Sequence, residues 1–272
     1  MDLAIKVKKV EDLPVRYEFI NLTKEGPITI ITINRPHVRN ALNAVSHVEL
    51  AHAFDDFAAD DRQWVAIITG AGEQAFCAGH DLKQDPAAAA PPLPSTGFAG
   101  LVARFDLNKP VIAAVNGVCV GGGFEIALAC DIIVAAASAT FALPEPRVGL
   151  AALAGGILRL PREIGLKHAM GLMLTGRRVS AQEGVELGFV NEVVVGDVLG
   201  AARRWATDIL QCSPMAIRAT KEVAQQGLTR PLDEAINDLH EYPAVKAMWA
   251  SQDALEGPAA FAGKRTPRWT GR

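Results

Sequence analysis

The sequence predicts an α/β fold that is followed by a helical C-terminal part. Short, continuously apolar runs at 65–69, 111–115 and 132–136 alternate with stretches of helical character, and such runs are typical of strands that are covered on both faces. From about residue 200 onward the pattern is helical, with no strand-like run. We therefore expect a mixed core over 1–199 and a helical module over 200–272.

The first elements are two strands and a helix. Residues 17–22 alternate apolar and polar side chains, the KEGP sequence at 24–27 is typical of a turn, and 28–33 is rich in β-branched residues. Asn43 can cap a helix that runs to about Ala59. After the core, four helices are expected, at 201–212, 214–227, 231–249 and 251–263.

The composition excludes several classes of protein. Half of the 272 residues are hydrophobic and 21% are charged, which is typical of a folded chain and not of a disordered one. The 27 basic and 30 acidic side chains give a net charge of -3, so a nucleic-acid partner is not expected. The N-terminus has no apolar signal sequence, and the longest uncharged run, at 86–103, contains four prolines. We therefore expect a cytoplasmic protein without a membrane span.

Metal and nucleotide-phosphate sites are not expected either. The cysteines form no CxxC pair, and the six histidines show no metal-ligand spacing. Gly70 and Gly72 lack the third glycine of a dinucleotide-binding loop, and no GK[ST] of a phosphate-binding loop follows them.

Two glycine-bearing segments can present backbone N–H groups to an oxygen that gains negative charge. The first, at 69–83, reads TGAGEQAFCAGHDLK and joins a strand to a loop with an Ala78–Gly79 step. The second, at 116–130, reads NGVCVGGGFEIALAC and is expected to start a helix near Gly122. The first N–H groups of a helix have no partner within it.

Two carboxylates lie in or after these segments. Glu125 falls in the first turn of the expected helix, where it could equally serve only to complement the helix dipole. Glu145 lies between Pro144 and Pro146 in a stretch otherwise poor in charge. Its carboxyl group can therefore be held rigidly with a raised pKa, unless it pairs with Arg147. Separated carboxylates beside N–H donors suit acid–base chemistry next to a polarised carbonyl.

The chain resembles the enoyl-CoA hydratase/isomerase (crotonase) superfamily over nearly its whole length. The segments that carry the resemblance are ITINRPHVRNALN at 31–43, AFCAGHDLK at 75–83, VNGVCVGGGFEIALACD at 115–131, FALPEPRVGL at 141–150, MLTGRRVSAQEGVELGFVNEVV at 173–194 and FAGKR at 261–265. The resemblance implies a crotonase-like spiral of ββα turns with a helical C-terminal oligomerisation module. It also implies a homotrimer, or a hexamer made of two trimers.

The same resemblance implies roles for individual residues. The family's two oxyanion-hole amides match Ala78 and Gly122, and the two catalytic glutamates of its hydratases match Glu125 and Glu145. The implied reaction is the reversible syn addition of water to a trans-2-enoyl-CoA, in which Glu125 activates water for attack at C3 and Glu145 delivers a proton to C2. No cofactor is implied beyond the coenzyme A of the substrate. The positions that match coenzyme A contacts are Arg39, Ala41, His80, Asp81 and Leu82, with Phe261 and Lys264 near the C-terminus.

The chain departs from the family pattern after the second glutamate. Many hydratases of the family have Pro-x-x-Gly-Gly-Thr there, whereas this chain reads ALAGGI at 152–157, which implies a more apolar pocket floor. The C-terminal sequence and the FALPE context resemble the carnitinyl-CoA dehydratase (crotonobetainyl-CoA hydratase) branch. The alternatives to enoyl-CoA hydration are therefore the reaction of that branch, enoyl-CoA isomerisation, and a non-catalytic acyl-CoA binding subunit. We expect the loop at 84–97 to decide which acyl group is accepted.

Overall fold

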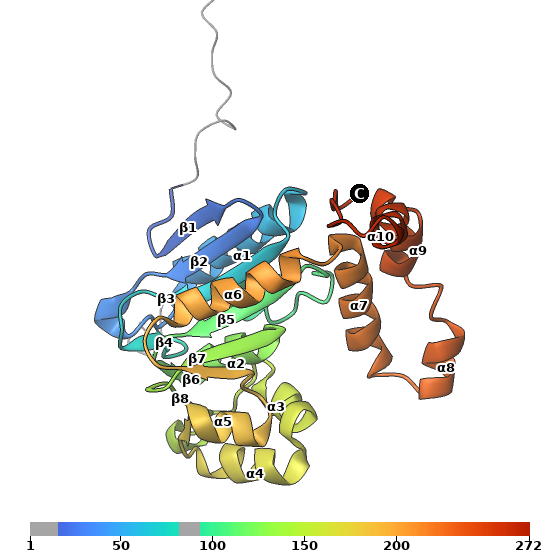
Figure 1. Cartoon of the computed structure of the whole chain (residues 1–272). Coiled ribbons are helices and arrows are strands. Elements are labelled where there is room, and N and C mark those ends of the chain that lie inside the picture. The colour runs from blue at the N-terminus through green and yellow to red at the C-terminus, as the bar shows by residue number, and fades with distance from the viewer. Residues whose placement is uncertain (1–15, 82–92) are drawn as a thin grey trace, which may run out of the picture.

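Two β-sheets form the centre of the molecule (Figure 1). The computed structural model describes residues 16–81 and 93–272. In the larger sheet β1 pairs antiparallel with β2, and the other neighbouring strands are parallel. The strand order of this sheet is β1 (Ile20–Glu25), β2 (Ile28–Ile33), β3 (Val65–Gly70), β5 (Val111–Val115), β7 (Ile132–Ala136) and β10 (Glu192–Val194).

The strands of the smaller sheet alternate along the chain with those of the larger one. Its strands lie in the order β4 (Ala75–Cys77), β6 (Val118–Val120), β8 (Thr140–Ala142) and β9 (Val179–Ser180). β4 comes directly after β3, β6 after β5 and β8 after β7, so each turn of the chain adds one strand to each sheet. This repeat is the expected spiral, and it confirms the predicted α/β class.

The central strands are apolar because both of their faces are covered. Ile31, Ile68, Ala113 and Ile133 lie side by side across β2, β3, β5 and β7, and each is at most 4% exposed. A strand in such a position reads as a continuous apolar run and not as an alternating one. This is why the sequence predicted these strands at their observed positions.

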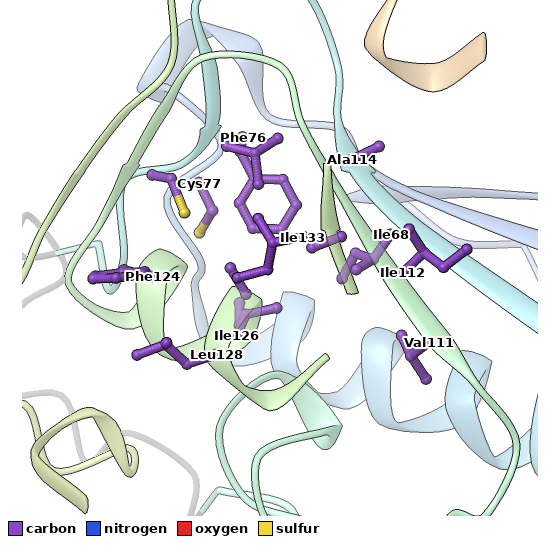
Figure 2. Close-up of a cluster of buried hydrophobic side chains, with 14 of the residues drawn as sticks. Ile68, Phe76, Cys77, Val111, Ile112, Ala114, Phe124, Ile126, Leu128 and Ile133 are labelled. Atoms are coloured by element: carbon purple, nitrogen blue, oxygen red, sulfur yellow. The ribbon is translucent and has the colours of Figure 1, made fainter. Parts of the chain in front are cut away.

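A buried helix connects the two sheets. α2 (Gly122–Ala129) has buried residues at every position from Gly122 to Leu128. Figure 2 shows Phe124, Ile126 and Leu128 of this helix in one cluster with strand residues such as Ile133. Because the helix is packed on all sides, its position relative to both sheets is fixed.

Other helices cover the sheets. The Asn43 side chain accepts a hydrogen bond from the Ser46 N–H at 2.8 Å and caps α1 (Ala44–Ala59) as predicted. α6 (Val198–Leu210) packs on β3, β5 and β7 and lies in front of the larger sheet in Figure 1. Three further helices lie below the sheets in this view: α3 (Gly156–Ile164), α4 (Leu166–Thr175) and α5 (Ala181–Leu187).

The last four helices form a lobe beside the sheets (Figure 1). They are α7 (Pro214–Gly227), α8 (Leu232–Asn237), α9 (Pro243–Trp249) and α10 (Gln252–Ala262). The single helix expected over 231–249 is thus two helices, because Pro243 disfavours a helical conformation at the residue before it. Among the helices of the described ranges, none combines the length and the apolar character that a membrane span requires.

The packing changes later along the chain than the predicted boundary at 199/200. The buried residues of α6, from Val198 to Ala206, belong to the main core, whereas Ala219, Tyr242 and Val245 form a separate small cluster in the lobe. The change therefore lies near Ser213, between α6 and α7. The sequence could not show this, because an amphipathic helix does not reveal which surface its apolar face covers.

Candidate active site

The 78–81 loop lies along the segment that leads into α1. Leu42 donates its N–H to the Gly79 carbonyl at 2.8 Å, and its own carbonyl accepts the Asp81 N–H at 2.9 Å. The Arg35 guanidinium forms an ion pair with Asp81 at 3.1 Å, in which both side chains are largely buried. Backbone and side-chain contacts therefore fix this loop against the entry to α1.

Three successive N–H groups of the loop differ in their partners. Ala78, the expected first oxyanion donor, gives its N–H to the Arg39 carbonyl at 3.1 Å. The Gly79 N–H donates to the Cys77 sulfur at 3.4 Å. His80 lies opposite Leu42 in a parallel bridge, and its N–H points away from Leu42, since Leu42 bonds to the residues on either side of His80. Within the described ranges the His80 N–H meets no acceptor, so His80 presents the free amide of this loop.

A second free amide lies beside this loop, at the start of α2. Gly122 is the first residue of the helix, so its N–H has no partner in the helix. A Cβ on Gly79 would lie 3.0 Å from the Gly122 nitrogen. Gly79 also has a φ of +90°, which residues with a side chain rarely adopt. The conformation and the close approach of the two segments therefore both require glycine at position 79.

Glu125 is buried in the first turn of α2. Glu125 is 3% exposed, and its Oε1 accepts the Gly156 N–H at 2.8 Å. A Cβ on Gly156 would lie 2.9 Å from the Glu125 Cγ, so glycine is needed for this contact. Burial raises the pKa of Glu125 to about 7; the Gly156 N–H opposes the shift, and the charge on Glu145 adds to it.

Glu145 approaches the same helix start. It begins the 3₁₀ turn Glu145–Val148, and its Oε1 would lie 3.1 Å from a Cβ on Gly121. Its Oε2 is buried and meets no donor among the described residues, and burial raises the pKa of this carboxyl group. The ion pair with Arg147 considered as an alternative is not seen, since Arg147 Nε donates to the Thr175 carbonyl at 2.9 Å.

The two carboxyl groups interact. A negative charge on Glu145 raises the pKa of Glu125, because a like charge nearby disfavours ionisation. The Gly156 N–H stabilises negative charge on Glu125, whereas the unpartnered Oε2 of Glu145 favours the protonated form. The pair therefore supplies two carboxyl groups in different surroundings, each of which can give or take a proton.

The free amides and the carboxyl groups meet around the first residues of α2. This arrangement can polarise a carbonyl oxygen and transfer protons at neighbouring atoms. Within residues 16–81 and 93–272, no three His, Cys, Asp or Glu side chains gather as a metal ion would require. The free amides and the carboxyl groups can together perform acid–base catalysis beside a stabilised oxyanion.

The residues expected to contact coenzyme A fall into two regions. Those of the first region lie together at the 78–81 loop and the entry to α1: Arg39, Ala41, His80 and Asp81. Phe261, which is 88% exposed, and Lys264 belong to the end of the C-terminal lobe, which Figure 1 shows apart from α2. Leu82 and residues 84–92 of the expected specificity loop lie outside the described residues.

Two contributors to this site were missed by sequence reasoning. Gly156 holds Glu125 through its N–H, and the only signal was a glycine pair at the start of a helix. Arg159 lies near enough to Glu125 for its charge to lower the Glu125 pKa, and it donates to the Val102 carbonyl at 2.6 Å. Nothing in the sequence links α3, which contains both residues, to Glu125, because the contact arises only when successive turns of the spiral pack on one another.

The chain matches known proteins over most of its length. The family profile described as enoyl-CoA hydratase/isomerase matches residues 23–272. A carnitinyl-CoA dehydratase from Salmonella enteritidis is 45% identical over 263 residues, which cover 94% of this chain and 99% of that protein. A carnitinyl-CoA dehydratase from Salmonella arizonae is 45% identical over 262 residues, which cover 93% and 99%.

Solved structures share the whole fold. An enoyl-CoA hydratase from Mycobacterium tuberculosis is 40% identical, with a TM-score of 0.86 and coverage of 93% of this chain and 99% of that one. An enoyl-CoA hydratase from Mycobacterium marinum is 41% identical, with a TM-score of 0.88 and the same coverage of 93% and 99%. These likenesses confirm the predicted crotonase-like architecture.

Replacing Glu125 by Gln should stabilise the protein, and more so at high pH. The folded-state pKa is raised to about 7 from 4.5. Below pH 4.5 the Glu125 carboxyl group is protonated in both the folded and the unfolded protein. Between pH 4.5 and the folded-state pKa it ionises only in the unfolded chain, so the folded protein loses stability as the pH rises. We expect the gain in the free energy of unfolding over wild type to increase by about 2 kcal/mol between pH 5 and pH 8, as measured by urea denaturation.

The matched control is Glu73→Gln, because Glu73 is exposed and lies outside the site. Its effect on the free energy of unfolding should be the same at both pH values. A gain for Glu125→Gln that does not change with pH would contradict the idea that the native protein buries this charge at a cost.

Proposed function

Because the chain belongs to the enoyl-CoA hydratase/isomerase family, we propose that it is an enoyl-CoA hydratase, which adds water reversibly to a trans-2-enoyl-CoA. The observation that carries this proposal is the coupled pair of Glu125 and Glu145 beside the free Gly122 amide. Hydration needs a base for water and an acid for carbon. Isomerisation of a double bond needs one proton shuttle, and a non-catalytic acyl-CoA binding subunit needs none.

In the proposed mechanism the thioester oxygen accepts hydrogen bonds from the His80 and Gly122 amides. Negative charge develops on this oxygen as water adds to the double bond, and fixed N–H donors stabilise it. The loss of one such donor costs about 3–4 kcal/mol in other enzymes. We assign the first donor to His80 in place of Ala78, because the Ala78 amide already donates to the Arg39 carbonyl.

The two glutamates transfer the protons. Glu125, whose carboxyl group accepts the Gly156 N–H, takes a proton from water as the water oxygen attacks C3. Glu145 gives its proton to C2. Because both carboxyl groups belong to one site at the start of α2, hydrogen and hydroxyl arrive on the same face of the double bond. After the step Glu125 carries the proton and Glu145 the charge, and exchange with solvent restores the starting state.

Glu125→Gln and Glu145→Gln should each lower kcat for crotonyl-CoA hydration by roughly 10²–10⁴-fold, because each removes a group that transfers a proton. The reaction is followed by the loss of ultraviolet absorbance of the conjugated thioester. Glu73→Gln, an identical substitution at an exposed position, should retain wild-type kcat. Undiminished activity of Glu145→Gln would eliminate this mechanism.

A second candidate function is the hydration of crotonobetainyl-CoA, the reverse of carnitinyl-CoA dehydration. The observation that favours it is the 45% identity to carnitinyl-CoA dehydratases over 94% of the chain. Against it, a trimethylammonium group is best held by a carboxylate or an aromatic face, and the segment that follows the site is apolar, with Leu150 and Leu153 exposed by 56% and 79%.

A panel of crotonyl-, hexenoyl-, decenoyl- and crotonobetainyl-CoA separates these two functions. We expect kcat/KM for the best uncharged substrate to exceed that for crotonobetainyl-CoA by at least about tenfold, since a permanent charge gains nothing from apolar side chains. A kcat/KM that is highest for crotonobetainyl-CoA would assign the protein to the second function. The 84–97 loop stays our predicted determinant of this preference.

We also propose that the protein forms a homotrimer, or a hexamer of two trimers, through its C-terminal lobe. Leu228, the C-cap of α7, and Leu232 and Ile236 of α8 are exposed by 88%, 75% and 59%, and exposed apolar side chains gathered in one segment are typical of a protein contact. In such an assembly Phe261 and Lys264 of one subunit could reach the coenzyme A bound by another.

Light scattering should give the mass of three or six chains for the wild type. Leu232→Glu should shift it toward one chain, because a charge would be buried at the contact. Val195→Glu is the matched control, since Val195 is 94% exposed and lies outside the lobe. A monomeric wild type would overturn the proposal.

A further inference from the structure

A buried histidine contacts both the 78–81 loop, which carries one free amide, and a turn that packs beside the other. His47 lies in α1, one turn after the cap, and is 1% exposed. Its ring stacks on the His80 ring with centroids 5.9 Å apart and planes 13° apart. It also meets the Phe98 ring edge to face, with centroids 4.4 Å apart. One imidazole therefore contacts a side chain of the 78–81 loop and a side chain of the turn at Phe98–Gly100.

Phe98 in turn packs on the start of α2. A Cβ on Gly122 would overlap the Phe98 ring, so the ring occupies the space next to the second free amide. The contacts thus run from Gly122 through Phe98 and His47 to His80. These contacts connect the residues that carry the two free amides, and neither glutamate takes part in them.

A hydrogen bond fixes the orientation of the His47 ring. Nδ1 accepts the Ala99 N–H at 3.0 Å, so the neutral ring carries its proton on Nε2. Burial and the nearby His80 lower the pKa of His47 to about 4, which keeps the ring neutral. Nε2 is buried and meets no partner among the described residues, so the Ala99 bond is the hydrogen bond that orients this ring there, beside its contacts with the His80 and Phe98 rings.

The turn that His47 holds is strained. Ala99 has a φ of +55°, a conformation that non-glycine residues rarely adopt and that persists only when neighbouring contacts enforce it. The bond from its N–H to His47 is such a contact. Loss of the acceptor would let the turn relax and Phe98 move away from Gly122.

We propose that His47 is a positioning residue that sets the spacing of the His80 and Gly122 amides. This inference rests on the proposed function, because it assumes that the two amides bind the thioester oxygen. It predicts an effect on states in which that oxygen is negatively charged, and little effect on the binding of a neutral thioester.

Two ligands and three variants test the proposal. Acetoacetyl-CoA can bind as its enolate, which carries negative charge on the thioester oxygen, whereas butyryl-CoA stays neutral. His47→Phe keeps a ring but removes the acceptor for Ala99, and His47→Asn keeps an acceptor but removes the ring stack. His52→Phe is the matched control, because His52 lies on the same helix, is exposed, and shares a hydrogen bond of 2.8 Å between its Nδ1 and the Tyr17 hydroxyl.

For His47→Phe we expect kcat for crotonyl-CoA to fall about tenfold and the Kd of the acetoacetyl-CoA enolate to rise by a similar factor, since a donor displaced from its position loses much of its effect. KM and the Kd of butyryl-CoA should change by less than about threefold. His47→Asn should lie between His47→Phe and wild type, and His52→Phe should equal wild type.

Wild-type values of kcat and enolate Kd for His47→Phe would overturn the proposal, as would an equal loss in His52→Phe. If His47→Phe does not fold, the test uses His47→Asn. The proposal is then overturned if the ratio of the enolate Kd to the butyryl-CoA Kd is the same in His47→Asn as in wild type. Failure of the wild type to bind either thioester would instead refute the proposed function. Binding and turnover by the wild type with unaffected variants would refute only the role of His47.

Discussion

The contact between Gly79 and the start of α2 is the constraint on which the site depends. Two chain segments from different turns of the spiral meet there backbone to backbone, with no side chain between them. The contact is prepared one step earlier, where Cys77 of β4 and Cys119 of β6 are register partners. A Cβ on Gly123 would overlap the Cys77 carbonyl, so the helix start is pressed against the end of β4. The free amides of the two segments can lie this close together only because both segments have glycine, without a side chain, at the point of contact.

The positions of Glu125 and Glu145 depend on the same close packing. Glu125 lies in the same buried helix that forms the contact, and Gly156, from the next turn of the spiral, supplies the N–H that holds it. Three successive turns therefore contribute to one site. Burial raises the pKa of both glutamates, that of Glu125 to about 7, which is unfavourable for the folded protein but brings proton transfer by Glu125 into the neutral range.

Much of the fold could be predicted from local signals. The apolar runs gave the central strands, Asn43 marked the start of α1, and three successive glycines marked the start of α2. Features that depend on contacts distant in sequence could not be predicted in this way. Whether Ala78 or His80 presents its amide is decided by the pairing of the 78–81 loop with Leu42 and Arg39. Similarly, α6 belongs to the core and not to the C-terminal lobe because it packs on the larger sheet. Neither the pairing of a loop nor the packing of a helix on a sheet leaves a signal in the local sequence.

The burial of α2 on every face bears on how this protein could be adapted in the laboratory. From Gly122 to Leu128 no side chain has a surface that could vary without disturbing the core. Random libraries over this helix would mostly yield misfolded chains. Exposed residues such as Leu150 and Leu153 carry no such restriction, so substitutions there should be tolerated far better than substitutions in the helix.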